Sequence, residues 1–239
     1  MFGAEACVDG NVDSCNPIAE AAAWARMVNQ ARISGHCEGM VVEATRRYIG
    51  KEQPATIDLV NESETTHRIF RSFSTQFLPE VVEERDGWAK KSLSELINNI
   101  ASNLEAENPG LTLGLYTENG GHAVLPYALS TLDSGVIRMN VYDSNWPGKN
   151  RYVDVDLTTK TWRFSFSGED PANDPDAWTG GPQDMDLTPL SAREGTCPFC
   201  GDGTKVAKTT MLIRSSNLEW SVETDGGVVS PANPVGTDG

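Results

Sequence analysis

The chain lacks any run of apolar residues near the roughly 20 that a membrane-spanning helix requires, and its first residues lack the basic-then-apolar order of a secretory signal. Basic residues are also scarce, since 19 Lys and Arg stand against 34 Asp and Glu and the net charge is -15 at pH 7. A surface this acidic repels phosphate groups. We therefore expect no membrane insertion and no nucleic-acid partner.

Histidine and cysteine are scarce as well, with three and five residues. Cys7 lies close to Cys15 and Cys197 lies close to Cys200, so Cys37 is the odd thiol. Local disulfides from the outer four would indicate an oxidising compartment, which favours an extracellular or cell-surface domain. The alternative for Cys197 and Cys200 is a zinc site, but the sequence has no second Cys-x-x-Cys pair to complete one.

The spacing of apolar residues is helical in the first half of the chain and strand-like in the second. Helices are predicted over residues 17–30, 37–50, 64–73 and 92–105. From Gly110 onward, short β-rich runs separated by turn residues predict an antiparallel meander over 111–117, 122–130, 136–142, 151–156 and 161–166. Helices first and strands second, in separate blocks, indicate an α+β fold.

The main domain is expected over residues 18–166, and composition separates it from its flanks. The flanks are a polar lead-in over 1–17, a loop rich in Gly, Pro and Asp over 167–195, a small Cys-containing segment over 196–224 and a linker-like tail over 225–239. The segment 196–224 is expected to complete the sheet or to form a minor lobe. The chain is expected to be a monomer or a domain of a larger protein.

Cys37 lies where the predicted helix 37–50 begins. Ser34 is a good N-cap residue, and the apolar residues after Cys37 recur at helical spacing. The positive end of a helix dipole stabilises a thiolate, which makes a thiol reactive at neutral pH. Cys37 is therefore a candidate nucleophile, although a lone cysteine is more often a small core residue.

A thiol nucleophile needs a base within hydrogen-bond reach, and three histidines are available. His36 is adjacent to Cys37, and consecutive helix residues point about 100° apart, which places it poorly. His67 lies in a polar helical stretch without a local partner. His122 opens a strand directly after a Gly-Gly turn, and we predict that it is the base.

Asp143 is the candidate that orients the imidazole. It follows three apolar residues at alternate positions of the strand 136–142, and neighbouring strands of a meander place such residues side by side. Asn145 is the alternative third member. For the oxyanion, Gln30 can supply a side-chain amide and the start of the helix can supply the backbone N–H of Cys37.

The order Gln30, Cys37, His122, Asp143, with the nucleophile on a helix and the other groups on a later meander, resembles papain-like cysteine peptidases. It is most similar to the compact branch that processes double-glycine bacteriocin leaders, over roughly residues 20–166. The resemblance implies a nucleophile helix packed on an antiparallel sheet, an acyl-enzyme on Cys37, a peptide or protein substrate and no required cofactor. Glu38 departs from the pattern, because it puts a negative charge beside the thiol.

Two other interpretations of the same residues stay open. The chain is then either a catalytically inactive papain-like domain that serves binding or assembly in a bacterial-type surface protein, or an acyltransferase that passes the acyl group to an amine.

Asp9, Asn11 and Asp13 space oxygen ligands at alternate positions, as calcium loops do, and are candidate calcium ligands. The run lacks the closing bidentate acid of such loops. An ordinary turn built from Asp, Asn and Gly is the simpler interpretation.

Overall fold

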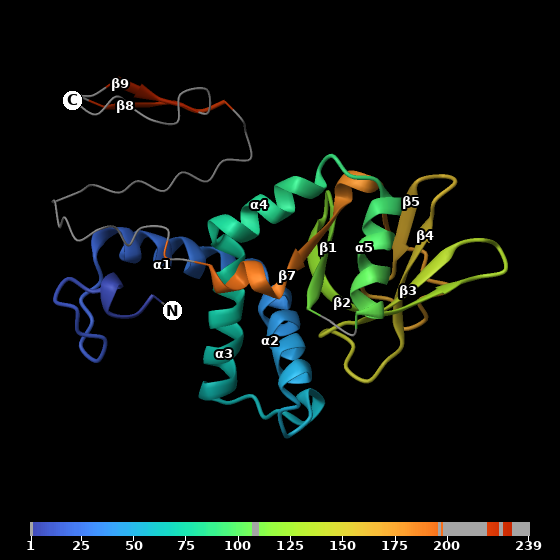
Figure 1. Ribbon diagram of the computed structural model, residues 1–239, viewed down its shortest axis with the longest axis horizontal. Coiled ribbons are helices and arrows are strands. Elements are labelled where there is room, and N and C mark those ends of the chain that lie inside the picture. Colours follow the sequence, from blue (N-terminus) through green and yellow to red (C-terminus); the bar gives the residue numbers. More distant parts are fainter. Residues whose placement is uncertain (1, 107–109, 196, 198–218, 225–226, 231–239) are drawn as a thin grey trace.

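A computed structural model of the chain describes residues 2–106, 110–195, 197, 219–224 and 227–230. Within these residues, five α-helices precede a curled, seven-stranded antiparallel sheet (Figure 1). The helices are α1 (Ala19–Ala31), α2 (Cys37–Gly50), α3 (Ser63–Ser74), α4 (Pro79–Trp88) and α5 (Leu93–Glu105). The predicted α+β class is confirmed, and α4 is a helix that the spacing of apolar residues did not indicate.

The main sheet is a meander with two additions. Its strands are β1 (Leu111–Thr117), β2 (Gly120–Thr131), β3 (Ile137–Tyr142), β4 (Arg151–Asp156), β5 (Thr161–Phe164), β6 (Trp178–Gly180) and β7 (Met185–Pro189). They are ordered β6-β5-β4-β3-β2-β1-β7, and each neighbouring pair is antiparallel. The sheet curls enough for β6 to approach β1 as well as β5.

Residues 167–195 do not form the simple loop that their composition indicated. They contain β6 and β7, and β7 pairs with β1 in a register that sets Leu187 opposite Leu113. Both side chains are fully buried, because this face of β1 and β7 forms part of the main core. These strands are too short for alternation to identify them, and the partner of β7 is remote in sequence.

The main sheet is completed by β7, and of the segment 196–224 the structure describes residues 197 and 219–224. Its strand β8 (Val222–Thr224) pairs with β9 (Gly227–Val229), from the predicted tail, in a separate two-stranded sheet. Residues 196, 198–218, 225–226 and 231–239 lie outside the described residues.

The main core lies between α5 and one face of the sheet. Ser92 begins α5 with a capping box, because its hydroxyl accepts from the Glu95 N–H at 3.3 Å and the Glu95 carboxylate accepts from the Ser92 N–H at 2.8 Å. The predicted apolar stripe of α5 is buried at Leu93, Leu96, Ile97 and Ile100. It packs on the inner side chains of β1 to β5 and β7.

Strand β2 separates this core from a second, smaller cluster. Val124 points into the main core, whereas its neighbours Ala123 and Leu125 contact Val41 of α2. Alternate residues of a strand face opposite sides, so β2 contacts α2 on one face and the α5 side on the other. This places the start of α2 against the sheet.

Helix α2 is also held tightly against α3. A Cβ atom at Gly39 would lie 2.3 Å from the carbonyl oxygen of Ile69 and 2.8 Å from the Cβ of Phe73, so only glycine fits there. Further along, the carboxylate of Glu43 forms an ion pair with Arg68 at 2.5 Å. These contacts with α3 therefore fix the orientation of the first turn of α2.

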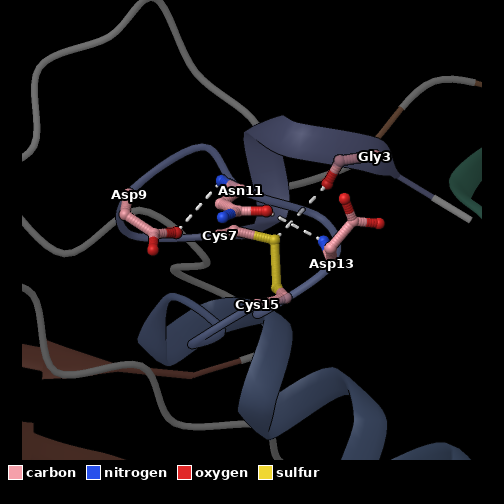
Figure 2. The surroundings of a disulfide bond; sticks show 6 residues. All are labelled: Gly3, Cys7, Asp9, Asn11, Asp13 and Cys15. Atoms are coloured by element: carbon pink, nitrogen blue, oxygen red, sulfur yellow. Dashed lines mark hydrogen bonds between the residues drawn. A yellow bond between two sulfur atoms is a disulfide. The ribbon is translucent and has the colours of Figure 1, made fainter.

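The lead-in is closed by a disulfide between Cys7 and Cys15, the local pairing expected from their spacing (Figure 2). Phe2 packs edge-on against Trp24 of α1, which ties this loop to the first helix. In the part of the chain that the structure describes, no helix has the length and apolar character needed to cross a membrane.

Candidate active site

Cys37 is the first residue of α2, as its position before an apolar helix predicted. The N-cap residue is His36, not Ser34, because Ser34 ends a separate 3-10 turn and Gly35 follows with a φ of 124°. No side chain among the described residues caps α2 by a hydrogen bond. The backbone N–H groups of the first turn therefore remain available beside the thiol.

The thiol of Cys37 is half-buried and is the free thiol of the described residues. It packs against the small cluster of Val41, Ala123 and Leu125, together with Tyr142 at the end of β3. These contacts bring the helix start to the strand that carries His122 and to the strand that precedes Asp143.

His122 and Asp143 are joined by a buried hydrogen bond. His122 Nε2 lies 2.9 Å from Asp143 Oδ1, and the two residues are 3 % and 1 % exposed. Because a carboxylate only accepts, Nε2 carries the proton and Nδ1 is the ring nitrogen left for Cys37. The predicted pairing of the start of β2 with the end of β3 therefore brings these two side chains together.

Burial alone would lower the pKa of His122, but hydrogen bonds and negative charge from Asp143 and Cys37 raise it to about 9. The sulfur of Cys37 is thus near enough to raise the pKa of the imidazole. With its pKa raised above neutrality, the His122 imidazole places a positive charge beside the sulfur of Cys37 at pH 7.

Aromatic rings surround the imidazole. Phe166 meets the His122 ring edge-on with centroids 5.0 Å apart, and Phe164 stacks on it at 5.9 Å. Trp178 of β6 stacks in turn on Phe166 at 4.6 Å. This wall excludes water from the histidine and strengthens its electrostatic contacts.

The chain after β5, which carries Phe166, is held by two side chains. Trp146 Nε1 donates to the carbonyl oxygen of Phe166 at 2.9 Å, and Arg151 Nη1 donates to that of Gly168 at 2.8 Å. The Arg151 guanidinium also lies over the Trp146 ring, 4.5 Å from its centroid. The aromatic wall is therefore fixed by the β3–β4 connection and by β4.

Asn145 supports Asp143 and does not replace it. The backbone N–H of Asn145 donates to Asp143 Oδ1 at 2.9 Å, while the residue itself is exposed. The second carboxylate oxygen, Oδ2, is buried and has no hydrogen-bond partner among the described residues. Oδ1 therefore receives both the backbone N–H and the imidazole.

Glu38, which departs from the resemblance, has a buried partner that the sequence did not indicate. Arg193, on the 3-10 turn Leu190–Glu194, donates to the Glu38 carboxylate and is 2 % exposed. The two residues are 155 positions apart, so no local pattern points to the pair.

Other predicted residues take different places. Gln30 is exposed on the last turn of α1, and the 3-10 turn Arg32–Ser34 follows this helix. No hydrogen bond within the described part of the chain joins the Gln30 side chain to Cys37. His36 packs edge-on against Phe73 at 5.7 Å, and His67 is exposed on α3. Neither of these two histidines contacts Asp143 in the described structure.

The candidate calcium residues form successive turns inside the disulfide loop. Asp9 Oδ1 accepts from the Asn11 N–H and Asn11 Oδ1 accepts from the Asp13 N–H, both at 3.0 Å (Figure 2). Among the described residues there is no group of three His, Cys, Asp or Glu side chains arranged to hold a metal ion. Of the zinc candidates, Cys197 is bonded in a disulfide and is therefore not a free thiolate ligand, and Cys200 lies outside the described residues.

A cavity of about 480 Å³ lies at the β1–β2 turn and β6, and its lining does not include Cys37, His122 or Asp143. The turn between β1 and β2, just before His122, forms one wall, and Trp178 of the aromatic wall forms another. Three carboxylates line it, those of Glu118, Asp176 and Asp184. The cavity lies at the end of the sheet where β2 begins and β3 ends, which is also the end that carries His122 and Asp143.

No protein-family model matches the chain, and no curated protein and no solved structure matches it significantly.

Proposed function

We propose that the chain is a thiol hydrolase of the papain-like type, a cysteine peptidase with Cys37 as nucleophile, His122 as base and acid, and Asp143 as the residue that orients the imidazole. The position of His122, hydrogen-bonded through Nε2 to Asp143 and close to Cys37, carries this proposal. A buried carboxylate, an imidazole of defined tautomer and a thiol at a helix start are the parts that acyl transfer to a thiol requires.

In the proposed first step, the Cys37 thiolate attacks the carbonyl carbon of a peptide bond. The C–S bond forms, and the carbonyl electron pair moves to oxygen. The backbone N–H groups at the start of α2 stabilise that oxyanion, because no side chain in the described structure caps them. Gln30 remains our candidate for a second donor, since six residues separate it from Cys37.

The oxyanion then collapses, and the C–N bond breaks. The amine leaves with the proton of the His122 imidazolium, and the acyl group stays on the Cys37 sulfur as a thioester. His122 Nδ1 takes a proton from a water molecule as the water oxygen bonds to the thioester carbon. The C–S bond then breaks, the acid product leaves, and the Cys37 thiolate and the His122 imidazolium are restored. Asp143 stabilises the imidazolium in both halves of the cycle without taking up its proton.

A peptide substrate is proposed to reach the thiol along the end of the sheet that holds the cavity. The cavity gives it a wall of Trp178 and an acidic lining next to the histidine strand. Since sites of this kind bury substrate side chains in concave pockets, we place one side chain of the substrate there. The disulfide of the lead-in supports an extracellular or cell-surface setting, because such bonds persist in oxidising compartments.

Alkylation tests the site without knowledge of the substrate. Iodoacetamide is expected to modify Cys37 of the folded protein at pH 6, and His122→Ala is expected to slow the reaction at least about tenfold because the thiolate loses its counter-ion. His67→Ala is the matched control, since His67 is exposed on α3. Intact mass spectrometry follows the modification. Equal rates of alkylation in His122→Ala and in the protein without a substitution would overturn the proposed pairing of Cys37 with His122.

Turnover is tested with a mixture of random-sequence peptides read by mass spectrometry. Cleavage that is abolished in Cys37→Ala, with folding unchanged by circular dichroism, is the expected result. Equal cleavage by the alanine variant contradicts the proposal. The masses of the products also distinguish hydrolysis from transfer to an amine.

A further inference from the structure

The buried guanidinium of Arg193 sits in a site built from three separate parts of the fold. Its Nη1 donates to the Thr75 hydroxyl at 3.2 Å, and its Nη2 donates to the Thr112 hydroxyl at 2.7 Å and to the Glu38 carboxylate. Thr75 precedes α4, Thr112 lies on β1, and Glu38 lies in the first turn of α2.

Both hydroxyls are oriented for this task. Thr75 donates its own proton to the carbonyl oxygen of Ser72 at 2.7 Å, and Thr112 donates to that of Thr188 at 3.3 Å. Their lone pairs therefore face the guanidinium. Both hydroxyls are neutral. Glu38 is the one carboxylate among the described residues that bonds to Arg193, so this partly exposed carboxylate balances the charge of the buried guanidinium.

Glu38 directly follows Cys37, so an unpaired carboxylate there would oppose ionisation of the thiol. The same pair also joins the first turn of α2 to the 3-10 turn Leu190–Glu194, which directly follows β7. We propose that Arg193 is a positioning residue that sets the reactivity of Cys37 by neutralising Glu38 and by anchoring the first turn of α2. The inference rests on the thiolate role that the proposed function gives Cys37.

Other charged and titratable groups also surround the thiol. Those on or next to the elements that pack against it are His36, Glu38, His122, Tyr142, Asp143 and Arg193. The charge of Glu38 also interacts with three more distant groups, which are Arg85 of α4, Tyr116 of β1 and Asp186 of β7. On α3, Arg68 is paired with Glu43. Of these, the Glu38–Arg193 pair can be altered without touching His122 or Asp143.

The test is the pH profile of Cys37 alkylation by iodoacetamide in a set of charge variants. Arg193→Gln leaves Glu38 unpaired and is expected to move the midpoint up by about half a unit to one unit, which slows the reaction about three- to tenfold on the acid limb. Glu38→Gln leaves Arg193 unpaired and is expected to move the midpoint down by a similar amount. The midpoint of the double variant should lie close to that of the protein without a substitution.

Opposite signs separate a charge effect from a loss of packing, because damage to the fold would shift both single variants in one direction. Glu43→Gln is the matched control, as it removes a second carboxylate of α2, one that is buried and does not bond to Arg193, and it should leave the midpoint unchanged. Arg193→Lys, which keeps the charge, should stay near the original midpoint. If Arg193→Gln does not fold, the downward shift in Glu38→Gln decides alone.

Shifts of the same sign, or no shift in Glu38→Gln, overturn the inference. The readout needs no turnover of a peptide. A protein that alkylates as described but cleaves no peptide would therefore contradict the proposed function and leave the role of Arg193 standing.

Discussion

His122 donates its Nε2 proton to Asp143 Oδ1 at 2.9 Å, which assigns Nδ1 to the side of Cys37. A neutral imidazole so held can only accept at Nδ1, and a protonated one can only donate there. The same contact therefore fixes which ring nitrogen faces the thiol, and the protonation state of the ring decides whether that nitrogen accepts or donates.

The first prediction concerns the alkaline limb of activity. The proposed mechanism needs protonated His122, whose pKa of about 9 lies above its usual value of 6.5, so the active form is present at neutral pH and is lost as pH rises through 9. We expect kcat/KM to fall about tenfold per pH unit beyond that point. A pH–rate profile measures it, with circular dichroism to show that the protein stays folded. An alkaline limb near pH 6.5 contradicts the assignment.

Asp143→Asn removes the carboxylate that raises the pKa of His122. We expect the alkaline limb to move to lower pH and kcat/KM at pH 7 to fall about tenfold or more, because the ring loses its charged acceptor. Asp154→Asn is the control, since that carboxylate pairs with Arg138 on the same sheet and both side chains are partly exposed. It should leave the pH profile unchanged. A profile unchanged in Asp143→Asn would remove Asp143 from the site.

Gly39→Ala tests the close contact of α2 with α3. The added Cβ meets backbone of α3, so we expect a loss of about 1–3 kcal/mol in the free energy of unfolding, read by urea titration. Gly87→Ala is the control, because nothing lies within 4 Å of a Cβ on that helix and alanine favours helix by up to about 1 kcal/mol. Equal stability of the two variants would show that α2 can shift freely.

The acidic cavity predicts a preference for basic side chains in the substrate. Glu118→Gln combined with Asp176→Asn should lower the ratio of kcat/KM for an arginine peptide to that for its glutamine analogue about three- to tenfold. Asp133→Asn combined with Asp13→Asn removes the same charge at exposed positions outside the cavity. An equal change in both double variants would assign the effect to net charge.

Much of the sheet could be predicted because its strands have a clear local sequence pattern. β1 and β4 have the bounds predicted from alternation and turn residues, and the capping box of Ser92 marks the start of α5. The contact of His122 with Asp143 also followed from local pattern, since an acid in phase with buried Met139 and Val141 must face the same side.

The features that could not be predicted have weak local signals or depend on distant contacts. The start of α2 after His36 is set by Gly35, not by the N-cap propensity of Ser34. Helix α4 has Pro79 at its first turn but buries only Val81 and Trp88, so it lacks an apolar stripe. The partner of Glu38 comes from 155 positions away, and no periodicity in a sequence encodes such a pairing.

The pairing of β7 with β1 also orders events during synthesis of the chain. Tyr116 and Asp186, which meet across this pair at 2.8 Å, are 70 positions apart, whereas β1 to β5 each pair with the next strand along the chain. Closing a long loop is slow, so the meander can form while the edge of β1 is still open. Until residue 189 has left the ribosome, that edge is a surface on which two nascent chains can join.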